Sequence, residues 1–182
     1  MKKSSFRKGG QDYPKTGGKT LVCPAVRIGI ADTMFARGDM GKLAEQTIRK
    51  SKYSKQVQIE RVTVPGFKDL AVACKKLIEE QGCEIVIACG MTGKADIDYM
   101  CAHEAAMGIM QAQLMTNKHI IEVFVFENEA KGNDALLAKI MKNRTVKHTI
   151  NALNLVFNPK ALQKKAGTAQ RQGFSNERRI EL

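Results

Sequence analysis

The sequence predicts a three-layer α/β fold, in which helices cover both faces of a four-stranded parallel sheet. From Val26 onward, short β-rich runs alternate with longer stretches of helical period, which is typical of βαβ units. The strand predicted at residues 84–89 carries a continuous apolar run instead of an alternating one, which indicates cover on both faces and a central position. Right-handed crossovers between such strands place the connecting helices on the two faces.

Local patterns predict the individual elements. Strands are predicted at residues 26–31, 56–64, 84–89 and 119–126. The first helix begins after Asp39, a residue type that caps helices, because apolar residues then recur on one face. The second helix begins near Asp69, where apolar residues recur with helical spacing, and it ends at Gly82.

The two later helices are predicted to be longer. The third, at about residues 95–116, is apolar around much of its circumference, which indicates burial on more than one side and contact with another subunit. The fourth runs from Asp134 to about residue 155, and Asn158-Pro159 ends it before a short basic helix.

The chain is predicted to fold as one domain with two tails. With 182 residues and 43% hydrophobic content, it can bury a core without disulfides or metal. Residues 1–25 are rich in Lys, Gly and Ser and predict a flexible basic arm. The α/β domain is then expected at residues 26–166, and a C-terminal tail at 167–182.

Three features predict a cytoplasmic chain with no membrane partner. The longest apolar runs are far shorter than the roughly 20 residues that cross a bilayer. The basic N-terminus lacks the apolar stretch of a secretory signal. The five cysteines are odd in number and contain no Cys-x-x-Cys pair, so we interpret them as reduced, mostly buried thiols rather than disulfides or zinc ligands.

The net charge of +12 lies mostly in the tails. Residues 1–27 carry seven Lys or Arg against one acid and residues 160–182 six against two, which leaves 17 against 15 between them. A nucleic-acid-binding domain instead holds its basic residues on one folded face with aromatics for stacking, and this chain has only ten aromatics. We expect no nucleic-acid partner, and a basic RNA-associated module is kept as the alternative from another class.

A ligand of such a sheet binds beyond the carboxyl ends of the strands, which directs attention to the loops at residues 32–38, 65–69, 90–96 and 127–133. The third loop lacks the spacing of a phosphate-binding Walker motif, and no Rossmann glycine pattern follows the first strand, so no nucleotide cofactor is indicated. Asp96 and Asp98 leave Mg²⁺ open as a cofactor, although acids in the first turn of a helix also complement its dipole, and we favour that interpretation.

Five collinear stretches, between about residues 26 and 174, together resemble the archaeal riboflavin synthases. They are residues 30–37 (IADTMFAR), 63–70 (TVPGFKDL), 101–105 (CAHEA), 113–125 (QLMTNKHIIEVFV) and 171–174 (RQGF). The resemblance implies a flavodoxin-like, lumazine synthase-like fold and a homopentamer. It also implies the dismutation of two 6,7-dimethyl-8-ribityllumazine molecules to riboflavin and 5-amino-6-ribitylaminopyrimidinedione, in which a four-carbon unit is transferred.

The archaeal riboflavin synthases are in turn similar to lumazine synthase, which is the alternative function within the fold. Two departures favour riboflavin synthase. Lys94 stands where lumazine synthase has a histidine, and the basic, glycine-rich insertion that serves lumazine synthase as a phosphate clamp is lacking. A sugar-phosphate substrate requires such charge-assisted donors, whereas ribityllumazine carries no phosphate.

The resemblance implies two candidate catalytic residues. Glu127, at the end of the fourth strand, is the best-placed carboxylate for proton transfer, with Glu129 second. Lys94 can offset negative charge on the deprotonated lumazine, or it is a solvated loop lysine. His103 lies too far into the third helix and is expected to pack or to lie at an interface.

The substrate-binding residues implied by the resemblance come from the first three loops. Phe35 is the candidate ring-stacking platform, unless it covers the end of the sheet. Glycines allow backbone amides to approach the heterocycle, and Asp69 either contacts the ribityl chain or caps its helix. The full predicted set is Thr33, Phe35, Pro65, Gly66, Phe67, Lys68, Asp69, Met91, Thr92 and Gly93.

Overall fold

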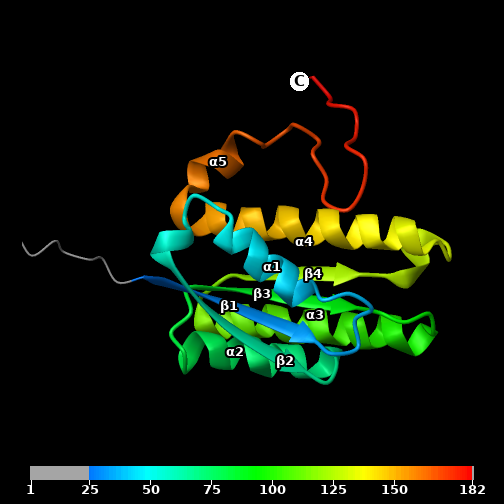
Figure 1. Ribbon diagram of the computed structural model, residues 1–182, viewed down its shortest axis with the longest axis horizontal. Coiled ribbons are helices and arrows are strands. Elements are labelled where there is room, and N and C mark those ends of the chain that lie inside the picture. Colours follow the sequence, from blue (N-terminus) through cyan, green and yellow to red (C-terminus); the bar gives the residue numbers. More distant parts are fainter. Residues whose placement is uncertain (1–24, 182) are drawn as a thin grey trace, which may run out of the picture.

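The computed structural model describes residues 25–181, so the predicted arm at residues 1–25 lies outside the described residues except for Ala25. The chain forms three layers, with α1 and α4 on one face of the sheet and α2 and α3 on the other (Figure 1). The four strands are all parallel, in the order β2-β1-β3-β4. The predicted fold class is confirmed.

The strands are β1 (Val26–Thr33), β2 (Val57–Val64), β3 (Ile85–Met91) and β4 (Ile120–Val125). Every residue of β3 is buried, as its continuous apolar run predicts, and β3 lies between β1 and β4. Both β1 and β3 extend two residues beyond their predicted ends, because Thr33 still pairs with Val64 and Met91 with Val125. The sheet therefore holds the first residues of two candidate loops rigidly.

The predicted helix boundaries follow from their caps. α1 (Met40–Arg49) begins after Asp39, whose side chain accepts a hydrogen bond from the backbone N–H of Lys42 at 2.7 Å. α2 (Leu70–Glu79) is followed by Gly82 with a φ of 67°, a left-handed conformation that glycine adopts without strain.

The two long helices also end at identifiable residues. α3 (Asp96–Thr116) stops at Asn117, which is left-handed with a φ of 51°. α4 (Asp134–Phe157) starts after Asn133, whose side chain accepts from the N–H of Leu136 at 2.9 Å, and Pro159 then opens α5 (Pro159–Gln163). Within the described part of the chain, no helix is long and apolar enough to cross a membrane.

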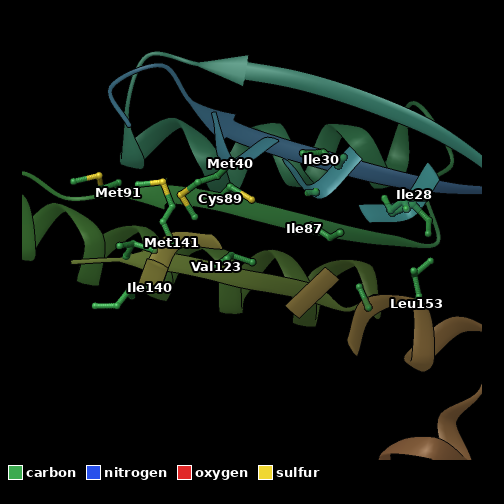
Figure 2. Close-up of a cluster of buried hydrophobic side chains, with 14 of the residues drawn as sticks. Ile28, Ile30, Met40, Ile87, Cys89, Met91, Val123, Ile140, Met141 and Leu153 are labelled. Carbon is green, nitrogen blue, oxygen red and sulfur yellow. The ribbon is translucent and has the colours of Figure 1, made fainter. Parts of the chain in front are cut away.

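The core has two parts, one on each face of the sheet. Figure 2 shows the first, where Ile28, Ile30, Ile87 and Val123 of the sheet meet Met40 of α1 and Ile140, Met141 and Leu153 of α4. The second part packs α2 and α3 on the opposite face, through residues such as Leu70, Cys74, Val86, Ala105 and Phe124. Burial of each large aliphatic side chain contributes about 1.5–3 kcal/mol to folding stability. The helices packed on both faces therefore hold the sheet in place, and with it the loops at its carboxyl edge.

The C-terminal tail packs against α4 (Figure 1). The N–H of Gly173 donates to Oδ1 of Asn143 at 2.9 Å, and Nζ of Lys147 donates to the carbonyl of Arg171 at 2.7 Å. The guanidinium groups of Arg144 and Arg171 lie 5.1 and 4.7 Å from the centre of the Phe174 ring. The tail stretch that carries the family resemblance is thus fixed to the last long helix.

Candidate active site at the carboxyl edge of the sheet

A cavity of about 290 Å³ opens where the carboxyl ends of β1, β2 and β3 meet. Ligands of parallel α/β sheets bind at this edge. All ten residues predicted to bind substrate line the cavity, together with two that were not predicted: Thr33, Phe35, Pro65, Gly66, Phe67, Lys68, Asp69, Met91, Thr92 and Gly93, with Asp98 and Cys101. Three separate loops therefore contribute to one concave surface, while the binding roles stay predictions.

Two kinds of side chain face this cavity from the ends of β1 and β3. Phe35 is 61% exposed, so its ring has little core contact and can accept a stacked heterocycle. Thr33 and Thr92 are buried, and their hydroxyls have no hydrogen-bond partner among the described residues. Buried polar groups are seldom left unpaired, so these two hydroxyls, whose oxygens are themselves covered, stay the predicted hydrogen-bonding groups of the cavity wall.

The loop after β2 contributes a buried aromatic ring and an ion-paired lysine to the cavity wall. Phe67 is buried, and its ring meets Phe124 edge-to-face at 4.6 Å between centroids. It also covers Gly90, where a Cβ would lie only 2.5 Å from the Phe67 ring. Nζ of Lys68 pairs with Glu104 of α3 at 2.7 Å. Phe67 is thus part of the cavity wall rather than a free stacking surface.

The alternative interpretation of Asp69 as a helix cap is wrong. Its side chain makes no capping hydrogen bond to α2. The reason is local, because a 3₁₀ turn (Phe67–Asp69) precedes the helix and gives Asp69 helical dihedral angles of −84° and −15°. A capping side chain normally requires an extended residue at that position. The exposed carboxylate of Asp69 therefore remains free on the cavity wall.

The two predicted catalytic residues meet each other beside the cavity. Oε1 of Glu127 lies 3.4 Å from Nζ of Lys94 and accepts a hydrogen bond from Arg37 at 3.0 Å. Arg37 also pairs with Asp134 at 2.9 Å, and the contacts with Asp134 and then Glu127 raise the pKa of Arg37. The side chain of Glu127 is only 11% exposed. Neither Lys94 nor Glu127 lines the cavity itself, although Lys94 directly follows Gly93 in its wall.

The sequence comparisons agree with this geometry. Residues 25–160 match the 6,7-dimethyl-8-ribityllumazine synthase family. The chain belongs to this family. It is 49% identical to the riboflavin synthases of Methanothermobacter marburgensis and Methanothermobacter thermautotrophicus over 148 residues, which is 81% of this chain and 95% of each relative. It is 48% identical to the riboflavin synthase of Archaeoglobus fulgidus over 149 residues, or 82% of this chain and 95% of that one. The resemblance to the archaeal riboflavin synthases is confirmed.

In this member of the lumazine synthase family, the carboxylate of Glu129, the second candidate for proton transfer, is occupied by hydrogen bonds within the protein. Its two oxygens accept from the guanidinium of Arg144 at 2.7 and 2.6 Å, and one also accepts from the N–H of Phe126 at 2.9 Å. Arg144 further donates to the carbonyl of Phe124 at 2.7 Å. This buried pair fixes the turn after β4, so Glu127 stays the candidate at that end of the sheet.

Two residues that line the cavity were not predicted from the sequence. Asp98 was interpreted as a partner of the helix dipole, and Cys101 as a packing residue. They lie three residues apart at the start of α3 and therefore share one helix face, which the fold turns towards the cavity. Their spacing was visible in the sequence, but the direction of that face was not.

The remaining described cysteines behave as core residues, as predicted. Cys74, Cys83 and Cys89 are buried free thiols. Burial raises the pKa of Cys74 to about 12 and that of Cys83 to about 11, and it also raises the pKa of Cys89. These thiols stay protonated near neutral pH and are poor nucleophiles. Cys23 lies outside the described residues.

The described residues contain no group of three or more His, Cys, Asp or Glu side chains placed to hold a metal ion. Oδ2 of Asp98 accepts a hydrogen bond from the N–H of Ala95 at 3.1 Å, while Asp96 is exposed in the same turn. This arrangement fits the favoured helix-dipole interpretation of the two acids. A role for Mg²⁺ stays an untested prediction.

A second cavity, of about 310 Å³, lies between α4, α5 and the tail. Its basic residues are largely engaged by the protein, since Lys147 donates to the tail backbone and Arg171 pairs with Glu177. It lies away from the carboxyl edge of the sheet, and we assign it no role in the site.

Proposed function

We propose that this chain makes riboflavin from two molecules of 6,7-dimethyl-8-ribityllumazine, by passing a four-carbon unit from one to the other and releasing the ribitylaminopyrimidinedione. The observation that carries this function is the 49% identity to two riboflavin synthases over 81% of the chain. The cavity supports it, because it offers an exposed aromatic ring beside unpaired hydroxyls and carboxylates, which suit a heterocycle with a polyol chain.

The charge of the cavity wall favours riboflavin synthase over lumazine synthase. Among the residues that line it, Lys68 is the one cation, and it is already paired with Glu104. A sugar-phosphate substrate needs free charge-assisted donors, preferably several. The wall instead carries the carboxylates of Asp69 and Asp98, neither of which is in an ion pair among the described residues, and these would repel a phosphate.

In the proposed reaction, positioning supplies much of the acceleration. Phe35 stacks against a lumazine ring, and the hydroxyls of Thr33 and Thr92 bind its polar atoms, so that two bound molecules react as one. Removal of a proton from the methyl at ring position seven leaves an anion that is delocalised into the heterocycle. Glu127 and Lys94 lie beside the cavity and not in its wall, and we propose that Glu127 accepts that proton and Lys94 offsets the negative charge where the ring extends towards them.

Purified protein is expected to produce riboflavin from the ribityllumazine alone, because the cavity wall holds no free cation for a phosphate substrate. The measurement is the rise of riboflavin absorbance and fluorescence with that single substrate. Parallel reactions with EDTA and with added Mg²⁺ test the metal that the sequence left open. Product that appears only when a sugar phosphate and the pyrimidinedione are supplied would reassign the chain to lumazine synthase.

We also propose that the chain assembles with copies of itself, with α3 at the contact. Large apolar side chains lie exposed along this helix: Ile97, Met100, Met107, Met110, Leu114 and Met115. His103, predicted to pack or to lie at an interface, is exposed on the same helix, which supports the interface interpretation. Exposed apolar surface of this kind marks contact sites, and the family resemblance supports five subunits in a ring.

The Leu114→Asp variant is expected to weaken this assembly, because Leu114 is 84% exposed in the single chain and a charge there would be buried at the contact. Light scattering measures the mass of wild type and variant at equal concentration. A wild-type protein that is monomeric and turns over at its full rate would contradict the proposal.

Free thiols at Cys74, Cys83 and Cys89 support a location in the cytoplasm, which cell fractionation can check.

A further inference from the structure

The carboxylate of Asp98 lies in the cavity wall next to Gly93 and close to the ring of Phe35. A Cβ on Gly93 would lie 2.4 Å from Oδ2 of Asp98 and 3.7 Å from a ring carbon of Phe35. The carboxylate thus fills the space that a side chain at position 93 would take, next to the edge of the predicted stacking ring. A side chain at position 93 would displace the carboxylate of Asp98, so Gly93 allows this close approach.

One oxygen of Asp98 is used by the protein and the other is free. Oδ2 accepts from the N–H of Ala95 at 3.1 Å, which anchors the carboxylate at the N-terminus of α3. The helix dipole there stabilises a negative charge. Oδ1 has no hydrogen-bond partner, and Asp98 forms no ion pair, among residues 25–181. Asp98 therefore presents an acceptor to whatever fills the cavity.

The chemistry of the lumazine limits what this acceptor can contact. A carboxylate beside the reacting part of the heterocycle would oppose the anion that forms there, because like charges repel strongly at short range away from water. The ribityl chain has the opposite character, since it is neutral and its hydroxyls are hydrogen-bond donors. An anchored carboxylate with one free oxygen therefore suits the polyol and not the reacting ring edge.

We propose that Asp98 is a specificity-determining residue that holds the ribityl chain, with its free Oδ1 accepting a hydrogen bond from a ribityl hydroxyl. The inference rests on the proposed function, because it takes the ribityllumazine as the ligand. It assigns Asp98 to binding and not to proton transfer. Ligands that lack the polyol should gain nothing from this residue.

The test compares Asp98→Asn with Asp96→Asn on two ligands. Asparagine keeps the size of the side chain and can still accept from the N–H of Ala95, but it removes the charge. The control removes a charge from the same helix turn at an exposed residue outside the cavity wall. The ligands are 6,7-dimethyl-8-ribityllumazine and 6,7,8-trimethyllumazine, which carries a methyl group in place of the ribityl chain. Fluorescence titration gives each Kd, and steady-state kinetics give KM and kcat.

Loss of a charged hydrogen bond predicts that Asp98→Asn raises Kd and KM for the ribityllumazine about tenfold or more. Its kcat should stay within about twofold of wild type, as expected when binding is lost equally from ground and transition states. The Kd for trimethyllumazine should not change, and Asp96→Asn should match wild type with both ligands.

Three results would overturn the proposal. Unchanged Kd and KM for the ribityllumazine would show that the free oxygen contacts no ligand group. An equal rise in Kd for both ligands would show that Asp98 only shapes the cavity wall. A large fall in kcat at constant KM, with an altered pH profile, would assign proton transfer to Asp98 instead. Failure of the wild type to make riboflavin would contradict the proposed function. The two binding titrations would still test whether Asp98 contacts the ribityl chain.

Discussion

The Glu127→Gln variant should lose about 100-fold or more of the wild-type kcat, since a positioned acid or base contributes roughly 10²- to 10⁴-fold. Glu127 is the buried carboxylate at the end of β4, in contact with Arg37 and Lys94. Glutamine keeps its size and can still accept a hydrogen bond from Arg37, but it cannot take a proton. Steady-state kinetics measure kcat and KM, and a urea midpoint on the same variant measures any loss of folding stability.

Asp134→Asn is the matched control for Glu127→Gln. Asp134 binds the same guanidinium of Arg37, but its side chain is 74% exposed whereas that of Glu127 is 11% exposed. The control should keep nearly full kcat if activity depends on the carboxylate of Glu127 and not merely on the pairing of Arg37. Full kcat in Glu127→Gln, with a lowered urea midpoint, would give Glu127 a purely structural role in the loop after β4.

Phe35→Ala should weaken binding of the ribityllumazine about 5- to 150-fold, if stacking contributes as much as base–aromatic stacking does in nucleic-acid complexes. The urea midpoint should change little, because Phe35 is 61% exposed. A phenylalanine in the core would instead cost about 3–5 kcal/mol of folding stability when truncated. Lumazine titration and urea unfolding on one variant therefore separate the two roles.

Met34→Ala is the matched control for Phe35→Ala. Met34 precedes Phe35 in the same loop, is 75% exposed and does not line the cavity, so its truncation should leave lumazine affinity unchanged. Unaltered affinity in Phe35→Ala, together with a large drop in the urea midpoint, would assign Phe35 to packing. Phe67 is the next aromatic of the cavity, but its edge-to-face packing on Phe124 leaves it less free to stack.

The sequence by itself determined the order of the elements and the location of the site. Hydrophobic period and caps such as Asp39 and Gly82 act over a few residues, so they can be read without the fold. The parallel sheet then brings the carboxyl ends of β1, β2 and β3 to one edge. For this reason the loops predicted from the chain, together with the family resemblance, supplied ten residues that line one cavity.

Only the tertiary structure decided which charged groups are free and which are paired. Arg37 reaches Glu127 across 90 positions of the chain, and Arg144 engages both oxygens of Glu129 across 15, so neither pairing follows from local sequence. The direction in which α3 turns Asp98 is likewise set by the packing of that helix on α2 and the sheet. Capping and hydrophobic period are local, whereas the partner of a charge is fixed by long-range packing, and that physical difference separates what the sequence predicted from what the fold decided.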